Sequence, residues 1–225
     1  MHRSPPVIVR SEPVVIRTLG LEGTIDVPAQ PEAVIVFAHG SGSSRHSPRN
    51  RNVAQVLQRA GLATLLFDLL TEAEAANRKN VFDIDLLATR LSAAVACVAA
   101  HNATAGLPVG LFGASTGAAA ALAAAATQPD DIGAIVARGG RPDLAGERHL
   151  HRVAAPTLLI VGGADREVLH LNEAARSLMS CPSELEVIPG AGHLFEEPGA
   201  LDEVAKLAAD WFLRWLTPQA SQDAR

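Results

Sequence analysis

The segment Gly113-Ala114-Ser115-Thr116-Gly117 places a serine between two glycines, in the pattern G-x-S-x-G. It follows an apolar run at 109–112 that is typical of a strand and precedes an alanine-rich run at 116–127 that is typical of a helix. In this context the glycines relieve clashes at a sharp turn, and the serine hydroxyl is exposed at its apex. Free N–H groups at the start of the helix would stabilise an oxyanion. The pattern predicts that Ser115 is a nucleophile, and a chance Gly-rich turn is the alternative.

A histidine late in the chain could supply the base that such a nucleophile needs. His193 ends the segment Pro189-Gly190-Ala191-Gly192-His193, which follows the last predicted strand. The glycines allow this loop to turn inward, at the edge of the sheet where ligands bind. An exposed or structural histidine is the alternative. The position of His193 in the chain is the one that a catalytic base would take, so we predict that it is the general base.

The third member of the set is a carboxylate that orients the base. Asp165 follows Gly162-Gly163-Ala164 at the end of a predicted strand, where an aspartate is often only the N-cap of the next helix. The order Ser115, Asp165, His193 is, however, the nucleophile–acid–base order of one fold class. We therefore predict Asp165 as the acid, with Asp143 as the second candidate.

A Gly/Ser-rich loop at 39–48 follows the apolar run at 34–38. Its glycines allow backbone N–H groups to converge, which predicts an oxyanion hole made by the N–H groups of Thr116 and Ser41. The sequence contains no tyrosine, so we expect backbone donors alone in this hole. His39 is expected to close the strand as a structural residue. A phosphate cradle is the alternative for the loop, but the two Gly-rich phosphate patterns are absent from it.

These residues require a sheet whose strands all end at one edge. The sequence predicts three short antiparallel edge strands, followed by strands that alternate with helices, which favours a doubly wound, mainly parallel α/β sheet. The expected edge strands are 7–10, 14–18 and 23–27; the other strands are 34–38, 62–67, 109–112, 134–137, 157–161 and 185–188; and the helices are 50–60, 83–100, 116–127, 167–179 and 199–216.

Composition excludes several classes of function. The 225 residues are 48% apolar and 19% charged, without a linker, which favours one domain over 1–225 with a frayed tail at 217–225. The net charge of −5 and the absence of a basic block argue against nucleic-acid and membrane partners.

The sequence lacks a signal-peptide core, so a soluble cytoplasmic protein is expected. Cys97 and Cys181 have no metal-ligand spacing, and no cofactor or metal is expected. The edge strands could support a homodimer, which nothing in the sequence requires.

Three segments together resemble the α/β-hydrolases: the Gly-x-Ser-x-Gly turn at 113–117, called the nucleophile elbow, the Gly-Gly-Ala-Asp turn at 162–165, and the Gly-Ala-Gly-His loop at 190–193. The resemblance is in particular to the small lidless branch of dienelactone-hydrolase-like proteins and carboxylesterases. The resemblance covers nearly the whole chain from His39 to the closing helix. It implies an α/β-hydrolase fold and a Ser-His-Asp triad that cleaves small esters through an acyl-enzyme. Dienelactone hydrolases have a cysteine at the elbow, so Ser115 favours ordinary ester chemistry. The 19 residues at 138–156, where family members with deep pockets insert a lid, are too few for a lid domain.

The substrate is less well defined by the sequence. Arg45, His46, Arg138 and Arg141 could border the mouth of the site and favour a negatively charged substrate, and solvated loop arginines are the alternative. Thioester or amide cleavage and cofactor-free peroxidation at the same triad remain open. A non-catalytic binding module with this fold is the other class.

The alanine content of the chain also predicts how the elbow helix packs. Of the 225 residues, 41 are alanine, and Leu122 is the only large side chain at 118–126. We therefore expect the helix behind Ser115 to lie close against the sheet.

Overall fold

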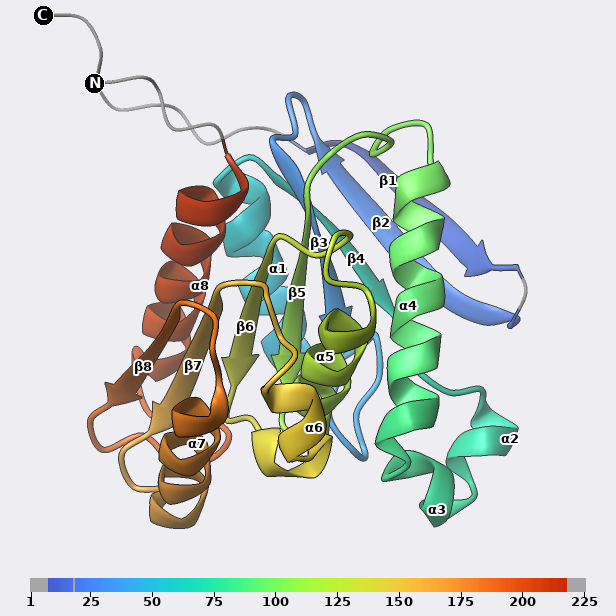
Figure 1. Ribbon diagram of the computed structural model, residues 1–225. Coiled ribbons are helices and arrows are strands. Elements are labelled where there is room, and N and C mark those ends of the chain that lie inside the picture. Colours follow the sequence, from blue (N-terminus) through green and yellow to red (C-terminus); the bar gives the residue numbers. More distant parts are fainter. Residues whose placement is uncertain (1–7, 18, 218–225) are drawn as a thin grey trace, which may run out of the picture.

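The computed structural model describes residues 8–17 and 19–217. Eight strands form one sheet in the order β1-β2-β4-β3-β5-β6-β7-β8 (Figure 1). The neighbours from β4 to β8 pair in parallel, whereas β1 and β2 are antiparallel to their neighbours. The strand order and pairing confirm the expected fold class, a mainly parallel α/β sheet with antiparallel N-terminal strands. The strands are β1 (Ile8–Ile16), β2 (Leu21–Pro28), β3 (Ala33–Ala38), β4 (Leu62–Phe67), β5 (Val109–Ala114), β6 (Ala134–Arg138), β7 (Thr157–Gly162) and β8 (Ser183–Ile188).

Helices cover both faces of the sheet, as a parallel sheet requires. One face is covered by α1 (Pro48–Arg59) and α8 (Ala200–Leu216), and the other by α4 (Ile84–Ala100), α5 (Thr116–Thr127) and α7 (Arg166–Leu178) (Figure 1).

Four short elements at the carboxyl edge of the strands were not predicted. They are α2 (Glu72–Ala75), α3 (Arg78–Val81), the 3₁₀ helix η1 (Pro142–Ala145) and α6 (Glu147–Leu150).

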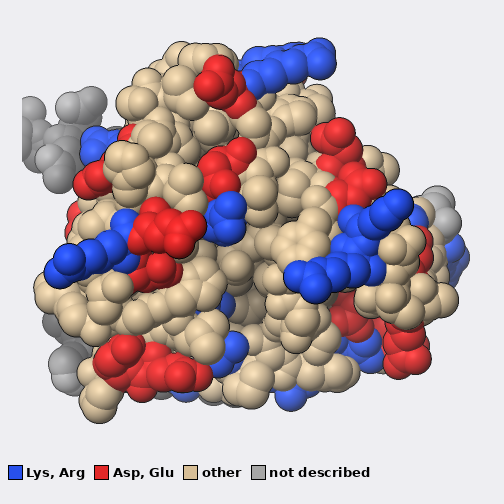
Figure 2. Space-filling model, turned by 90° about the horizontal axis from the view of Figure 1, so that it is seen from below, with Lys and Arg blue, Asp and Glu red and all other residues tan. Residues whose placement is uncertain are grey.

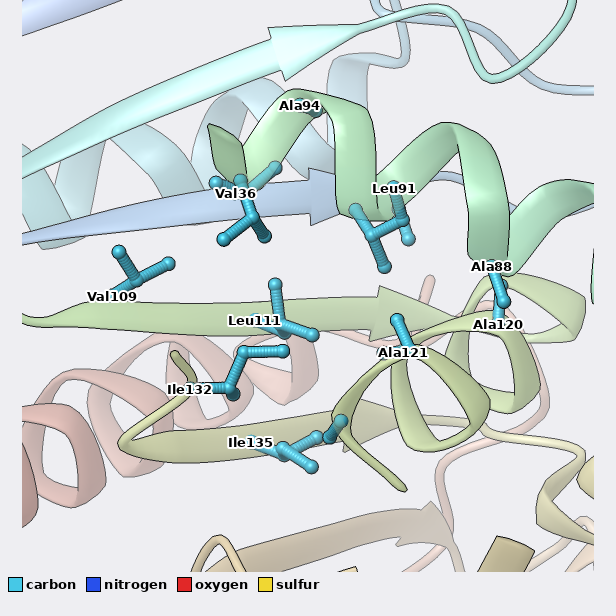
Figure 3. Close-up of a cluster of buried hydrophobic side chains, with 14 of the residues drawn as sticks. Val36, Ala88, Leu91, Ala94, Val109, Leu111, Ala120, Ala121, Ile132 and Ile135 are labelled. Carbon is cyan, nitrogen blue, oxygen red and sulfur yellow. The ribbon is translucent and has the colours of Figure 1, made fainter. Parts of the chain in front are cut away.

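Helix α5, whose alanine content predicts close packing against the sheet, is buried at every position from Thr116 to Ala126. Every side chain from Ala118 to Ala126 is at most 2% exposed. Figure 3 shows Ala121 of α5 and Leu91 of α4 in the same apolar cluster as Leu111 of β5 and Val36 of β3. Because small side chains fill little space between backbones, close packing here positions the start of α5 directly behind the end of β5.

The N-terminal strands differ from the prediction. The runs expected as two strands form the single strand β1, which is irregular between Ile8 and Arg10 and continues through Pro13. Proline lacks the N–H that a central strand must donate, but β1 pairs only with β2, so Pro13 is tolerated at this edge. Val7 and Thr18 of the predicted strands, and 218–225 of the predicted tail, lie outside the described residues.

No helix within the described ranges, 8–17 and 19–217, has both the length and the apolar character needed to cross a membrane.

Candidate active site

Ser115 lies at the junction of β5 and α5 in an unusual backbone conformation, with φ 51° and ψ −120°. A positive φ is costly for a residue with a side chain, so neighbouring groups must hold it. The Ser115 N–H donates to the carbonyl of Arg138 at 3.2 Å, and its carbonyl accepts from the N–H of Arg141 at 3.1 Å and of Ala118 at 3.0 Å. The residues that follow β6 therefore hold the turn in which Ser115 is the half-buried apex.

The two glycines of the elbow are required by close backbone contacts. A Cβ at Gly117 would lie 2.1 Å from the carbonyl oxygen of Ala38, and one at Gly113 would lie 2.5 Å from Cα of Ala118. Both distances are far shorter than van der Waals contact, and the atoms contacted belong to the backbone. The elbow is thus compatible with glycine alone at these two positions.

Gly117→Ala is expected to lower the free energy of unfolding by about 3 kcal/mol or more, because α5 would have to move away from β3. Chemical denaturation would measure the loss. Gly199→Ala is the control, since Gly199 has φ +81° but open space around a Cβ, and positive φ alone costs about 1–2 kcal/mol. Equal losses in the two variants would contradict the importance of the contact with Ala38.

His193 and Asp165 meet at the ends of neighbouring strands. His193 Nδ1 lies 2.7 Å from Asp165 Oδ2. Asp165 occupies the N-cap position of α7, yet its side chain accepts no N–H of that helix. The second candidate, Asp143, accepts two hydrogen bonds from the guanidinium of Arg141 at 2.8 and 2.7 Å. Of the two aspartates, Asp165 is therefore the one placed to orient the histidine.

A close backbone contact at Gly162 brings the turn that contains Asp165 and the loop that contains His193 together. A Cβ at Gly162 would lie 2.3 Å from the carbonyl oxygen of Ala191, which accepts the N–H of Ala164 at 2.9 Å. Beyond His193, Phe195 is only 2% exposed and has φ 56°, so it anchors the loop in the core. The sequence contains the Gly162-Gly163 pair, but it does not indicate that Gly162 contacts Ala191.

The Gly/Ser-rich loop packs against the elbow. A Cβ at Gly40 would lie 3.1 Å from Cβ of Ser115. Thr116 is the first residue of α5, so its amide has no acceptor within the helix. The Ser41 N–H lies beside it but already donates to the Thr116 hydroxyl oxygen at 2.8 Å. The structure thus brings the two predicted oxyanion donors together, with one of them bonded to a side chain.

Both ring nitrogens of His39 form hydrogen bonds with backbone groups, in keeping with the expected structural role. Its Nδ1 lies 3.0 Å from the carbonyl oxygen of Gly40, and its Nε2 accepts the N–H of Leu69 at 3.1 Å. Burial lowers the pKa of His39 from its ordinary value, opposed by the backbone hydrogen bond and by Asp68. The ring therefore links the ends of β3 and β4 as a neutral group.

This lowered pKa predicts a pH dependence of stability. The unfolded histidine binds a proton near pH 6.5 and the folded one only at lower pH, so the contribution of His39 is present above about pH 6.5 and is lost as the pH falls. We expect the free energy of unfolding to fall less steeply between pH 7 and 5 in His39→Asn than in the wild type. Urea denaturation at several pH values would measure this, and parallel profiles would contradict it.

A cavity of about 570 Å³ adjoins the elbow on the side of Thr116. Its lining comes from the start of β2, the loop after β3, the segment after β4, and α2 to α4. Leu69, Leu70 and Thr71 also line it, although nothing in the sequence pattern indicated that they would lie beside the elbow. Figure 2, which views the face where the parallel strands end, shows acidic and basic side chains interspersed rather than a field of one sign.

The four side chains predicted to contact substrate are not gathered at one place. Arg45 and His46 line the cavity, whereas Arg138 and Arg141 lie outside its lining. The Arg45 guanidinium is shared between Asp68 and Glu22.

The other three predicted contacts differ in burial. The exposed His46 lies beside Arg51, with 2.8 Å between Nδ1 and the guanidinium. Arg141 pairs with Asp143. Arg138 is only 5% exposed, and its Nε has no hydrogen-bond partner among the described residues. Burial, with a smaller effect of Arg49, lowers the pKa of Arg138 to about 10, so it keeps its charge at neutral pH.

No group of three His, Cys, Asp or Glu side chains in the described part of the chain is arranged to hold a metal ion.

Comparison with solved structures places the chain near a hydrolase. The crystal structure of dienelactone hydrolase from Anabaena variabilis ATCC 29413 has 50% sequence identity and a TM-score of 0.88, covering 95% of this chain and 100% of that one. Est1E from Butyrivibrio proteoclasticus has 16% identity and a TM-score of 0.76, covering 91% and 98% of the two chains, which shows a shared fold.

Curated relatives and a protein family also match. Two Mycobacterium tuberculosis proteins named "Putative phosphoribosyl transferase" are 57% identical over 209 residues, which are 93% of this chain and 47% of theirs. The chain thus spans about half the length of these relatives. Residues 31–209 match the family described as "Alpha/beta hydrolase domain". Since this match includes the elbow, Asp165 and His193, the chain belongs to the α/β-hydrolase family.

Proposed function

We propose that this chain is a serine hydrolase that cleaves carboxylic esters of small, accessible substrates. One observation carries the proposal: Ser115 stands at a strained strand–helix turn, on the same sheet edge as a histidine whose Nδ1 lies 2.7 Å from Asp165. A nucleophile, a base and a group that orients the base are the three parts that acyl transfer requires.

In the proposed reaction, His193 removes the proton of the Ser115 hydroxyl as its oxygen attacks the ester carbonyl carbon. The tetrahedral intermediate collapses, the C–O bond to the alcohol breaks, and His193 returns the proton to the departing oxygen. Water, deprotonated in turn by His193, then attacks the acyl-enzyme and releases the carboxylic acid and the Ser115 hydroxyl. Asp165 accepts the Nδ1–H throughout and stabilises the charged imidazole.

The expected substrate is a small molecule, because the cavity beside Thr116 has a volume of about 570 Å³, within the range of small-molecule sites. Ester chemistry is supported by the relative named as a dienelactone hydrolase, although dienelactone itself is not proposed because a serine stands at the elbow. Arg45 and His46, which line the cavity, remain the proposed contacts for a negatively charged group, whereas Arg138 and Arg141 lie outside its lining. Of these, Arg138 is the cation most deeply removed from water.

The name of the Mycobacterium tuberculosis relatives is not carried over to this chain, which covers 47% of their length. A single domain over 1–225 also remains a proposal. The residues on which the proposed activity depends all lie between 31 and 209, within the family match.

Labelling with a fluorophosphonate tests the proposal, because this probe forms a covalent bond with an activated serine. We expect stoichiometric labelling at Ser115, followed by turnover in a chain-length series of esters that exceeds turnover of matched thioesters and amides. Peroxidation would be assayed on the same preparation. Absence of labelling would contradict the proposal and favour a non-catalytic binding module, and faster turnover of thioesters or amides would contradict the ester assignment.

A further inference from the structure

We propose that the side-chain hydroxyl of Thr116, rather than the backbone N–H of Ser41, donates the second hydrogen bond to the oxyanion. The inference rests on the proposed serine-hydrolase function and deepens it by naming a further catalytic residue. It also departs from the expectation that backbone groups alone form the oxyanion hole.

The Thr116 hydroxyl can still donate a hydrogen bond. A hydroxyl can accept two hydrogen bonds and donate one. The Thr116 oxygen accepts the Ser41 N–H at 2.8 Å, and the hydroxyl donates to no acceptor among the described residues. Thr116 as a whole is only 4% exposed, so this hydroxyl lies on a largely buried residue. A buried donor of this kind is expected to find an acceptor when substrate binds.

Thr116 lies next to Ser115, close to where the oxyanion would form. As the residue after Ser115, it contributes the backbone N–H that faces an oxyanion in a nucleophile elbow. Its hydroxyl oxygen is three bonds from that same nitrogen and also contacts the Ser41 N–H, so it lies between the two expected donors. Thr116 also belongs to the lining of the cavity beside the elbow. We therefore expect a carbonyl oxygen that approaches the Thr116 N–H to reach the hydroxyl before it reaches the Ser41 amide.

The Ser41 N–H then acts through the hydroxyl. A hydroxyl whose oxygen accepts a hydrogen bond becomes a better donor through its O–H, because chains of hydrogen bonds polarise one another. The order Ser41 N–H, Thr116 hydroxyl, oxyanion is such a chain. The competing arrangement is that the hydroxyl merely covers the Ser41 amide in the free enzyme and moves aside when substrate enters.

Three variants of Thr116 distinguish these arrangements. Thr116→Ser keeps the hydroxyl and is expected to retain kcat within about threefold, whereas Thr116→Val places a methyl group against the Ser41 amide and is expected to lower kcat by about 100- to 1,000-fold. Thr116→Ala leaves the Ser41 amide accessible and is expected to lower kcat by at least about tenfold. In the valine and alanine variants KM should change little, because the oxyanion forms only in the transition state.

The measurements are kcat and KM on a small ester, the rate of fluorophosphonate labelling at Ser115, and the thermal midpoint, which checks that each variant is folded. Wild-type or higher kcat in Thr116→Ala would overturn the proposal, because the hydroxyl would then only cover the amide. Loss of kcat in Thr116→Ser equal to that in Thr116→Val would also overturn it. Failure of the wild type to label would contradict the serine-hydrolase function itself, whereas equal labelling of the wild type and Thr116→Val contradicts only the role of the hydroxyl.

Discussion

Ser115→Ala is expected to lower kcat for small esters by about 10⁴- to 10⁶-fold while leaving the fold intact, because the variant lacks the oxygen that attacks the carbonyl. Steady-state kinetics would measure the loss, and the thermal midpoint would report on folding. Labelling by the fluorophosphonate should disappear in the same variant.

Ser177→Ala is the matched control for this experiment. Ser177 lies exposed on α7, where its hydroxyl donates only to the carbonyl of Ala174, so activity and labelling should match the wild type. Turnover of Ser115→Ala within tenfold of the wild type would contradict the assignment of the nucleophile.

Asp165→Asn is expected to lower kcat by about 10⁴-fold, the second large effect. The amide of asparagine would donate to His193 Nδ1 and place the ring proton on the nitrogen that must act as base. The carboxylate lies 2.7 Å from Nδ1, so the substitution changes one atom of an existing contact and little else. Steady-state kinetics with a fixed ester would measure the loss.

Asp143→Asn is the matched control for Asp165→Asn, because Asp143 pairs with Arg141. We expect the control to retain kcat within about tenfold. A larger loss in Asp143→Asn than in Asp165→Asn would reverse the assignment of the acid.

Most of the sheet could be predicted because buried parallel strands are continuous apolar runs. The strands β3 and β5, for example, are buried at every position and are bounded by polar or glycine-rich loops. The short helices α2 and α3 bury no side chain, so they leave no periodic apolar pattern. Pro13 made one edge strand resemble two, since proline usually interrupts a strand that pairs on both sides.

The site could be predicted as far as chain order and turn chemistry specify it. The glycines around Ser115, Asp165 and His193 indicated where the backbone turns sharply. The partners of side chains could not be predicted, because they come from distant segments. Arg45 meets Asp68 after β4 and Glu22 in β2, and the Thr116 hydroxyl meets the amide of a loop that precedes it by 75 residues.

The contact between Gly162 and Ala191 has a consequence for how such a site can change its chemistry. It joins the turns after β7 and β8, so Asp165 and His193, the proposed acid and base, are held together at the ends of adjacent strands. Ser115, the proposed nucleophile, directly follows the last residue of β5, and β6 lies between β5 and this pair of strands. We therefore expect an exchange between serine and cysteine at position 115 to leave the turns that hold Asp165 and His193, the proposed acid and base, in place.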